Sequence, residues 1–281
     1  MTYERRSLVT LPVASVQLYS LAKEFTADMG GSLDKLAAIG LQNVEAFDFV
    51  NRAAELRTAL DNSGLAAPTG HAPLLSDELW TPAGSVPAPA PEKVFEAAAI
   101  AGIEVVIDPF VDPARWLTAE GVDDVAARLN AASEVAATFG LSVGYHNHAQ
   151  EFVKSFDGLT AYERFVAALD DRIALELDLF WAAVGEQDVP ALVAGLGGRV
   201  IAVHVKDGAI MSNPWAPGAP QLDPSAIVQS HAGAGDVPLA AALRANDSIR
   251  YAVIEYDKAP GDVFDDIAAS FSFLRAEGLV K

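Results

Sequence analysis

The stretch GLSVGYHNHAQEF at residues 140–152 decides the fold of this chain, because an apolar run ends there in two histidines, His146 and His148. Three later apolar runs also end in two polar residues with the same spacing of two: Glu176 and Asp178, His204 and Lys206, and Glu255 and Asp257. Residues two apart on a strand point to the same face, so the four pairs converge only if their strands lie side by side. A soluble core rarely collects that much charge without a reason.

Apolar β-rich runs alternate with alanine-rich helical stretches along the whole chain. The expected strands cover residues 13–19, 44–47, 65–69, 105–107, 141–146, 174–178, 200–205 and 251–255. The expected helices cover residues 32–39, 52–60, 92–101, 122–139, 159–169, 189–196, 238–245 and 263–277. Eight alternating units in 281 residues predict a single-domain (β/α)₈ TIM barrel over residues 1–281. A Rossmann-like sheet is the main rival, but no G-x-G-x-x-G follows the first strand.

Composition excludes several classes of protein. The net charge of −19 argues against nucleic acid and anionic membranes as partners. The sequence has no run near the roughly 20 apolar residues of a membrane span, and the N-terminus does not resemble a secretory signal, so we expect a cytoplasmic protein. The chain has no cysteine, so His, Asp or Glu must hold any metal.

Two segments rich in proline interrupt the alternation, residues 76–91 with Trp80 and residues 208–226 with Trp215. Both follow expected barrel strands, and the loops after the strands build the active-site face of such barrels. We therefore expect them to be walls or lids over a substrate. The alternative is a surface excursion whose tryptophan packs on its own loop.

Carboxylates and an imidazole gather where the last strands end. Asp178 ends one strand, His204 nearly ends the next, and Glu255 closes the last. This combination suits a divalent ion such as Mn²⁺, Mg²⁺ or Co²⁺. Three such ligands leave positions open for substrate oxygens, so the ion could polarise a carbonyl while a nearby base moves a proton. The alternative is that each is a satisfied, partly buried polar residue.

Seven segments together resemble the sugar phosphate isomerase/epimerase family of xylose isomerase-like TIM barrels. They are VQLYSL (16–21), GLQNVEAF (40–47), GLSVGYHNHAQEF (140–152), LELDLFWAAVG (175–185), RVIAVHVKDG (199–208), GAGDVP (233–238) and YAVIEYD (251–257). In that family Glu, Asp, His and Glu from strands five to eight hold a divalent metal, often manganese. The resemblance implies that Asp178, His204 and Glu255 take the last three places, with manganese as the first choice and Mg²⁺, Co²⁺, Zn²⁺ or Fe²⁺ as alternatives.

The fifth strand departs from the commonest family pattern, because the usual metal-binding glutamate falls at His146. Imidazole can replace carboxylate and shifts the preference towards borderline ions. The YHNH form resembles a branch that includes inosose dehydratases and enzymes acting on 3-keto-sugars and their glycosides. In such enzymes a histidine can serve as base beside a carbonyl. His148 is therefore the first candidate for proton transfer and Glu151 the second, and His146 could exchange roles with His148.

Further polar and aromatic residues end the expected strands. Lys206 shares a face with His204 and could stabilise a developing oxyanion, or it could form a salt bridge to a neighbour such as Glu176 or Asp207. The residues expected to bind substrate are Gln17, Tyr19, Glu45, His71, Trp116 and Trp181. Local hydrogen bonding is the alternative for His71, and core packing is the alternative for the tryptophans.

The leading hypothesis is a metal-dependent sugar or keto-sugar isomerase or epimerase that abstracts a proton beside a carbonyl held on the ion. A close alternative is a lyase or dehydratase acting on an inosose or a 3-keto-glycoside. Another is a sugar-binding accessory subunit without turnover. A DNA repair nuclease would need more histidines and a basic groove. The expected partner is a small sugar, and a homo-oligomer is an option because barrels of this family frequently associate.

Overall fold

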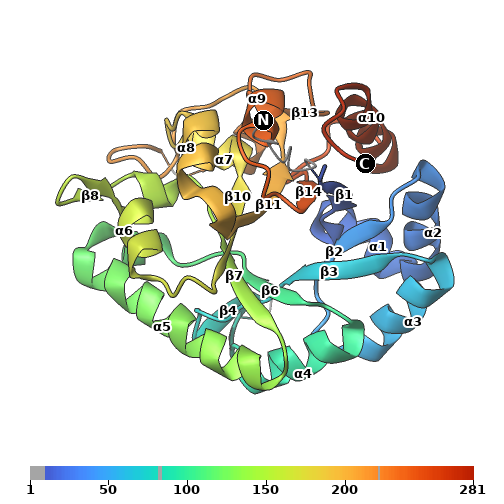
Figure 1. Ribbon diagram of the computed structural model, residues 1–281, viewed down its shortest axis with the longest axis horizontal. Coiled ribbons are helices and arrows are strands. Elements are labelled where there is room, and N and C mark those ends of the chain that lie inside the picture. Colours follow the sequence, from blue (N-terminus) through green and yellow to red (C-terminus); the bar gives the residue numbers. More distant parts are fainter. Residues whose placement is uncertain (1–9, 82–83, 221) are drawn as a thin grey trace, which may run out of the picture.

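The computed structural model describes residues 10–81, 84–220 and 222–281. These residues contain an eight-stranded parallel sheet in the order β1-β14-β11-β10-β7-β6-β3-β2, with helices around it (Figure 1). The strands are β1 (Val13–Val16), β2 (Asn43–Ala46), β3 (Ala66–His71), β6 (Val105–Asp108), β7 (Ser142–His146), β10 (Ala174–Asp178), β11 (Val200–Val205) and β14 (Tyr251–Ile254). A parallel bridge between Gln17 and Glu45 brings the two edges together. The predicted (β/α)₈ barrel is confirmed.

The helices cross over between successive strands and cover the outside of the barrel. They are α1 (Ala22–Ala27), α2 (Met29–Ile39), α3 (Ala53–Ser63), α4 (Pro91–Ala101), α5 (Ala119–Thr138), α6 (Ala161–Ala168), α7 (Leu179–Val184), α8 (Val189–Leu196), α9 (Leu239–Arg244) and α10 (Val263–Ala276). Among the described helices, none is long and apolar enough to cross a membrane.

Alternation along the strands separates an outer core from the barrel interior. On β10, Leu175 and Leu177 belong to the main apolar core, whereas Glu176 and Asp178 alternate with them and point to the opposite face. Two small apolar clusters inside the barrel are separate from that core: Val105, Ile107 and Ala174, and Ala202, Tyr251 and Val253. The inside of the barrel is therefore apolar along part of its length and polar at the end where the strands finish.

Two departures from the expected elements have local causes. The first strand ends at Val16 instead of reaching Tyr19, because the Gln17 side chain accepts a hydrogen bond from the Tyr19 amide and caps a 3₁₀-helix, Leu18–Leu21. The segment 76–91 contains an antiparallel hairpin of β4 (Glu78–Thr81) and β5 (Gly84–Pro87). Residues 1–9 and 82–83 and the Trp80 side chain, which bear on the expectations for the N-terminus and this loop, lie outside the described part.

One buried carboxylate, Asp207, organises the loop that precedes α9. Its Oδ1 accepts hydrogen bonds from the amides of Gly208 and Val237, and its Oδ2 accepts from those of Gly233 and Gly235, at 2.8–3.1 Å. Gly233 has φ +83°, a conformation that favours glycine. The GAGDVP motif therefore serves as a structural anchor at the site face of the barrel.

Replacing Asp207 by Ala should lower the free energy of unfolding by on the order of 2–3 kcal/mol, because four amides lose their acceptor. Urea unfolding measures the change. Asp236→Ala is the matched control, since the exposed Asp236 accepts only from the Ile210 amide at 3.3 Å. Equal losses in the two variants would contradict the anchoring role.

Candidate active site

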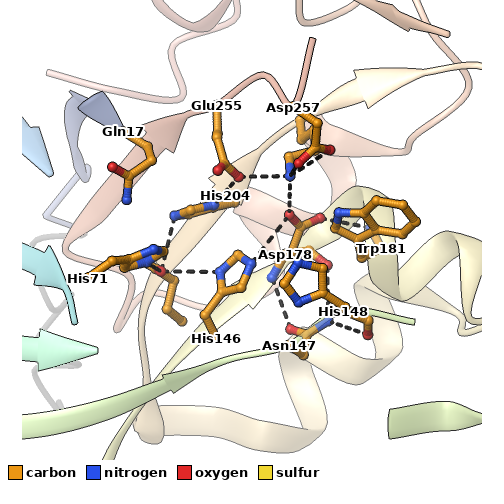
Figure 2. A network of polar contacts seen from close by, with 12 residues as sticks. Gln17, His71, His146, Asn147, His148, Asp178, Trp181, His204, Glu255 and Asp257 are labelled. Carbon is orange, nitrogen blue, oxygen red and sulfur yellow. Dashed lines mark hydrogen bonds and ion pairs between the residues drawn. The ribbon is translucent and has the colours of Figure 1, made fainter. Parts of the chain in front are cut away.

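Polar side chains from the strands of the barrel converge at one end, as their two-residue spacing predicts (Figure 2). The first group, which we call the mouth cluster, is His146, Asp178, His204 and Glu255. One nitrogen or oxygen from each lies within 4.8 Å of the others, and all four residues are buried. His204 Nδ1 lies 2.6 Å from Glu255 Oε2, and His146 Nε2 lies 3.8 Å from Asp178 Oδ2.

A second group, the inner cluster, consists of His71, His146, Glu176 and His204, and it shares two histidines with the first. Glu176 Oε2 lies 2.6 Å from His71 Nε2, 3.2 Å from His146 Nδ1 and 3.0 Å from His204 Nε2. Glu45 Oε1 lies 2.8 Å from His204 Nε2 and 3.1 Å from His71 Nε2. The inner cluster together with Glu45 thus balances two buried carboxylates against three imidazoles.

This arrangement raises the pKa of two of the three imidazoles and lowers that of the third. At His71, burial disfavours the charged form, but Glu45 and Glu176 outweigh it and raise the pKa to about 10. The same carboxylates, together with Glu255, raise the pKa of His204 well above its usual value against burial. At His146, burial and the neighbouring His204 lower the pKa well below its usual value. His146 is therefore neutral and can offer a lone pair.

Lys206 is the cation at the centre of the mouth. Its Nζ lies 3.0 Å from Asp178 Oδ2, 2.7 Å from Glu255 Oε2 and 3.1 Å from Asp257 Oδ2, and its side chain is 1% exposed. Burial opposes its charge, but these carboxylates raise the pKa of Lys206 well above its usual value. Lys206 therefore stays protonated, which suits a stabiliser of negative charge and not a base.

Aromatic rings surround His148 beside the mouth cluster. Its ring centroid lies 5.5 Å from that of Phe110, 5.7 Å from that of Trp181 and 6.2 Å from that of Trp215. Burial, followed by the positive charge of Lys206, lowers the pKa of His148 to about 3. Its Nδ1 atom is buried and makes no hydrogen bond in the described structure. His148 is therefore held in its neutral form, and the same burial and positive charge weaken it as a base.

The 208–226 segment contributes to this aromatic wall. Trp215 lies 5.4 Å from Trp181 between ring centroids, and Asn213 Nδ2 donates a 2.9 Å hydrogen bond to the Ala149 carbonyl next to His148. The segment therefore lies against the site, where the sequence predicted a wall. Its contact with substrate stays a prediction.

Glu151 supports the backbone near His148. Its Oε1 accepts a 2.7 Å hydrogen bond from the Tyr145 hydroxyl, and its Oε2 accepts a 3.0 Å bond from the His148 amide. Burial raises the pKa of Glu151 to about 7. Asn147 adds a similar contact by accepting a 3.0 Å hydrogen bond from the Asp178 amide. Proton transfer by Glu151 stays a prediction, while its visible contacts hold His148 in place.

The residues expected to bind substrate fall in different environments. Gln17 donates a 2.7 Å hydrogen bond to Glu45 at the inner cluster. Tyr19 is 48% exposed and meets the ring of Phe47 edge-on. Trp116 is fully buried and packs on Tyr145 and Phe165 at centroid distances of 5.7 and 5.4 Å. For Trp116 the structure favours the alternative of core packing.

The sequence placed Glu176 in one of the converging pairs and named it, or Asp207, as a salt-bridge partner in the alternative role of Lys206. Instead, Glu176 lies among imidazoles, Asp207 anchors a loop, and Lys206 pairs with other carboxylates. The spacing of Glu176 from Asp178 predicted that both side chains lie inside the barrel, but it could not identify the imidazoles that Glu176 contacts. The role of Phe110 was also missed, because its contact with His148 joins separate loops.

The mouth cluster fits a divalent ion on chemical grounds. Two imidazoles and two carboxylates are ligands that borderline ions such as Mn²⁺, Co²⁺, Zn²⁺ and Fe²⁺ accept. Asp178 Oδ2 is buried and makes no aligned hydrogen bond in the described part of the chain, but Lys206 Nζ lies 3.0 Å from it, so an ion would share this oxygen with the ammonium group. Its Oδ1 is held by the Trp181 amide at 2.7 Å. The residues present could therefore hold such an ion without rearranging the strands.

The chain belongs to the xylose isomerase-like TIM barrel family, whose model matches residues 33–277. No curated protein matches the sequence. Among solved structures, a sugar phosphate isomerase/epimerase from Parabacteroides distasonis has a TM-score of 0.75 at 20% identity and covers 100% of both chains.

Two further solved structures share the fold. The IOLI protein with a bound zinc atom has a TM-score of 0.68 at 14% identity and covers 95% of this chain and 98% of its own. The 3-keto-D-glucoside 4-epimerase YcjR from E. coli has a TM-score of 0.65 at 16% identity, with 94% and 99% covered. At these identities the likeness establishes the fold of the barrel.

Replacing Lys206 by Met should lower the stability of the metal-free protein by about 3–5 kcal/mol, because buried carboxylates lose their partner. Added Mn²⁺ or Zn²⁺ should restore more stability to the variant than to the native protein, since an ion can neutralise Asp178 and Glu255. Thermal unfolding with and without the ion measures both effects. Lys258→Met is the control at an exposed lysine nearby, and an equal gain from the ion in the two variants would contradict the prediction.

Proposed function

We propose that this protein is a divalent-metal-dependent isomerase or epimerase of a sugar or keto-sugar that acts by proton abstraction next to a carbonyl. The observation that carries the proposal is the mouth cluster, four buried potential metal ligands at the ends of four neighbouring strands, beside His148, whose Nδ1 makes no hydrogen bond in the described structure. Structural neighbours that include a named epimerase support the reaction type by analogy of fold.

The ion would be held by His146, Asp178, His204 and Glu255. When bound, a divalent ion supplies Lewis acidity, which lowers the pKa of a C–H bond next to a carbonyl. Manganese remains our first choice, with cobalt, zinc and iron favoured over magnesium by the two imidazoles.

The chain's own residues divide the remaining work. His148 is the proposed base because it lies beside the mouth cluster and its Nδ1 makes no hydrogen bond in the described structure. Burial and the charge of Lys206 lower its pKa to about 3 and so weaken it as a base, whereas the pKa of Glu151, the second candidate, is raised by burial to about 7. Lys206 keeps its positive charge next to the mouth and stabilises negative charge that develops on a substrate oxygen. Trp181 and Trp215 offer apolar faces against which the C–H face of a sugar can pack.

The substrate we propose is an unphosphorylated sugar. Lys206 lies at the mouth cluster and already contacts three carboxylates. Its positive charge is therefore balanced by the protein itself and is not left for a phosphate group. A dianionic phosphate would also meet Asp178 and Glu255, which repel it.

A lyase or dehydratase acting on an inosose or a 3-keto-glycoside is the alternative. It begins with the same proton abstraction and then expels a leaving group from the neighbouring carbon. The YHNH sequence favours it, and the structural neighbour named as a 3-keto-D-glucoside epimerase acts on such a keto-sugar. An accessory sugar-binding subunit is the remaining option if the mouth binds no metal.

Elemental analysis of the purified protein should find about one equivalent of a divalent metal that is lost in both Asp178→Ala and His204→Ala. Each variant removes a charged or imidazole ligand of the mouth cluster. His231→Ala is the matched control, because His231 is an exposed histidine. A native protein without metal, and without gain on reconstitution, would contradict the proposed mechanism and favour the accessory subunit.

Replacing His148 by Gln should reduce turnover of keto-sugars, inososes or 3-keto-glycosides by about 10²–10⁴-fold while the metal content stays unchanged. The loss follows from removing the base and not the ion. A steady-state rate with a screened substrate, together with deuterium exchange into that substrate, measures the step. His231→Gln controls for the substitution, and undiminished exchange in the His148 variant would move the role of base to Glu151.

A further inference from the structure

The rings of His146 and His204 each lie between two carboxylates, with one nitrogen facing the mouth cluster and the other facing the inner cluster. His146 directs Nε2 to Asp178 in the mouth cluster and Nδ1 to Glu176 in the inner cluster. His204 directs Nδ1 to Glu255 and Nε2 to Glu176. The two histidines therefore form the boundary between the clusters, as Figure 2 shows for the labelled rings of His146 and His204.

One oxygen, Glu176 Oε2, contacts a nitrogen of all three rings. It lies 3.2 Å from His146 Nδ1, 3.0 Å from His204 Nε2 and 2.6 Å from His71 Nε2. Burial raises the pKa of Glu176, whereas the charges of His204 and His71 favour its ionised form. In that form it only accepts hydrogen bonds, so each of these nitrogens then carries a proton. A neutral imidazole has one N–H and one lone pair. At the neutral His146, the proton on Nδ1 therefore leaves the lone pair on Nε2, which faces the mouth.

His204 holds a proton on each nitrogen, since Nδ1 also lies 2.6 Å from Glu255 Oε2. An ion would displace the proton on Nδ1, because the proton on Nε2 is held by both Glu176 and Glu45.

We propose that Glu176 is a positioning residue that fixes the tautomers of His146 and His204, so that a metal ion is bound through Nε2 of His146 and Nδ1 of His204. The inference rests on the proposed metal-dependent function. Hydrogen bonding of the second ring nitrogen to a carboxylate both orients a ligating histidine and makes it a stronger ligand.

The two histidines depend on Glu176 to different degrees. Glu45 Oε1 also lies 2.8 Å from His204 Nε2, and Gln17 holds that oxygen by a 2.7 Å hydrogen bond. His146 Nδ1 contacts Glu176, and the ion pairs of the described residues give it no second carboxylate. Loss of the Glu176 carboxylate should therefore disturb the orientation and tautomer of His146 more than those of His204.

The short contacts also argue against Glu176 as a metal ligand itself. In a tetrahedral site with bonds of about 2.0–2.1 Å, ligand atoms lie roughly 3.3 Å apart. The 2.6 Å separation of His71 Nε2 and Glu176 Oε2 is a hydrogen-bond distance. The inner cluster therefore holds protons. In the mouth cluster, His204 Nδ1 and Glu255 Oε2 also share a proton at 2.6 Å, and an ion would have to replace that proton.

The test uses the native chain loaded with Zn²⁺, labelled with ¹⁵N at histidine. Long-range ¹H–¹⁵N correlation spectra identify which nitrogen of each ring is bound to the metal, and we expect Nε2 at His146 and Nδ1 at His204. Binding through the opposite nitrogens would place the ion in the inner cluster and overturn the inference, while metal dependence would stand. A native protein that binds no Zn²⁺ would overturn the proposed function and the inference with it.

The matching variant is Glu176→Gln, which keeps the shape and removes the charge. We expect its Kd for Zn²⁺, measured by chelator competition, to rise about 10–100-fold, with the ¹⁵N signals of His146 showing a mixture of tautomers. Glu45→Gln should weaken binding less and leave His146 unchanged. Thermal unfolding of both variants establishes that they are folded, and the spectra of the native protein test the proposal independently of them. Native affinity in Glu176→Gln would contradict it.

Discussion

The carboxylate of Glu176 lies among three imidazoles inside a barrel wall that excludes water, and the rest of the site is arranged around that interaction. In such surroundings charges interact more strongly than in water, and each unpaired one is costly. Closure between Gln17 and Glu45 brings the first two strands into this network. The apolar residues deeper in the interior keep the charges together at one end of the barrel.

A consequence is that protons and Lys206 share the same few oxygens that a metal ion would need under the proposed function. Asp178 Oδ2 and Glu255 Oε2 face the imidazoles of the mouth cluster, and Lys206 contacts both of these oxygens. The ammonium therefore balances the carboxylates in the absence of an ion. When an ion takes part of that role, Lys206 keeps Asp257 as a partner and remains close to the place where substrate charge would develop.

Much of the architecture could be predicted because the relevant signals are local. The strand and helix runs follow from the alternation of apolar β-rich stretches with alanine-rich stretches along the chain. The convergence of Asp178, His204 and Glu255 followed from the adjacency of parallel strands in a barrel. Contacts made across the barrel could not be predicted in the same way. The contact between Glu176 and His71, for example, joins residues 105 positions apart, and no spacing in the sequence predicts it.

The sequence by itself determined the barrel, the face on which its polar pairs lie, and the kind of chemistry those residue types can perform. Only the tertiary structure decided which atoms meet. It placed Trp116 in the outer core, assigned Glu151 contacts that support His148, and directed the two nitrogens of His146 to different carboxylates. The physical reason is that alternation fixes the direction of a side chain from its own strand, whereas hydrogen-bond partners depend on packing between strands far apart in the chain.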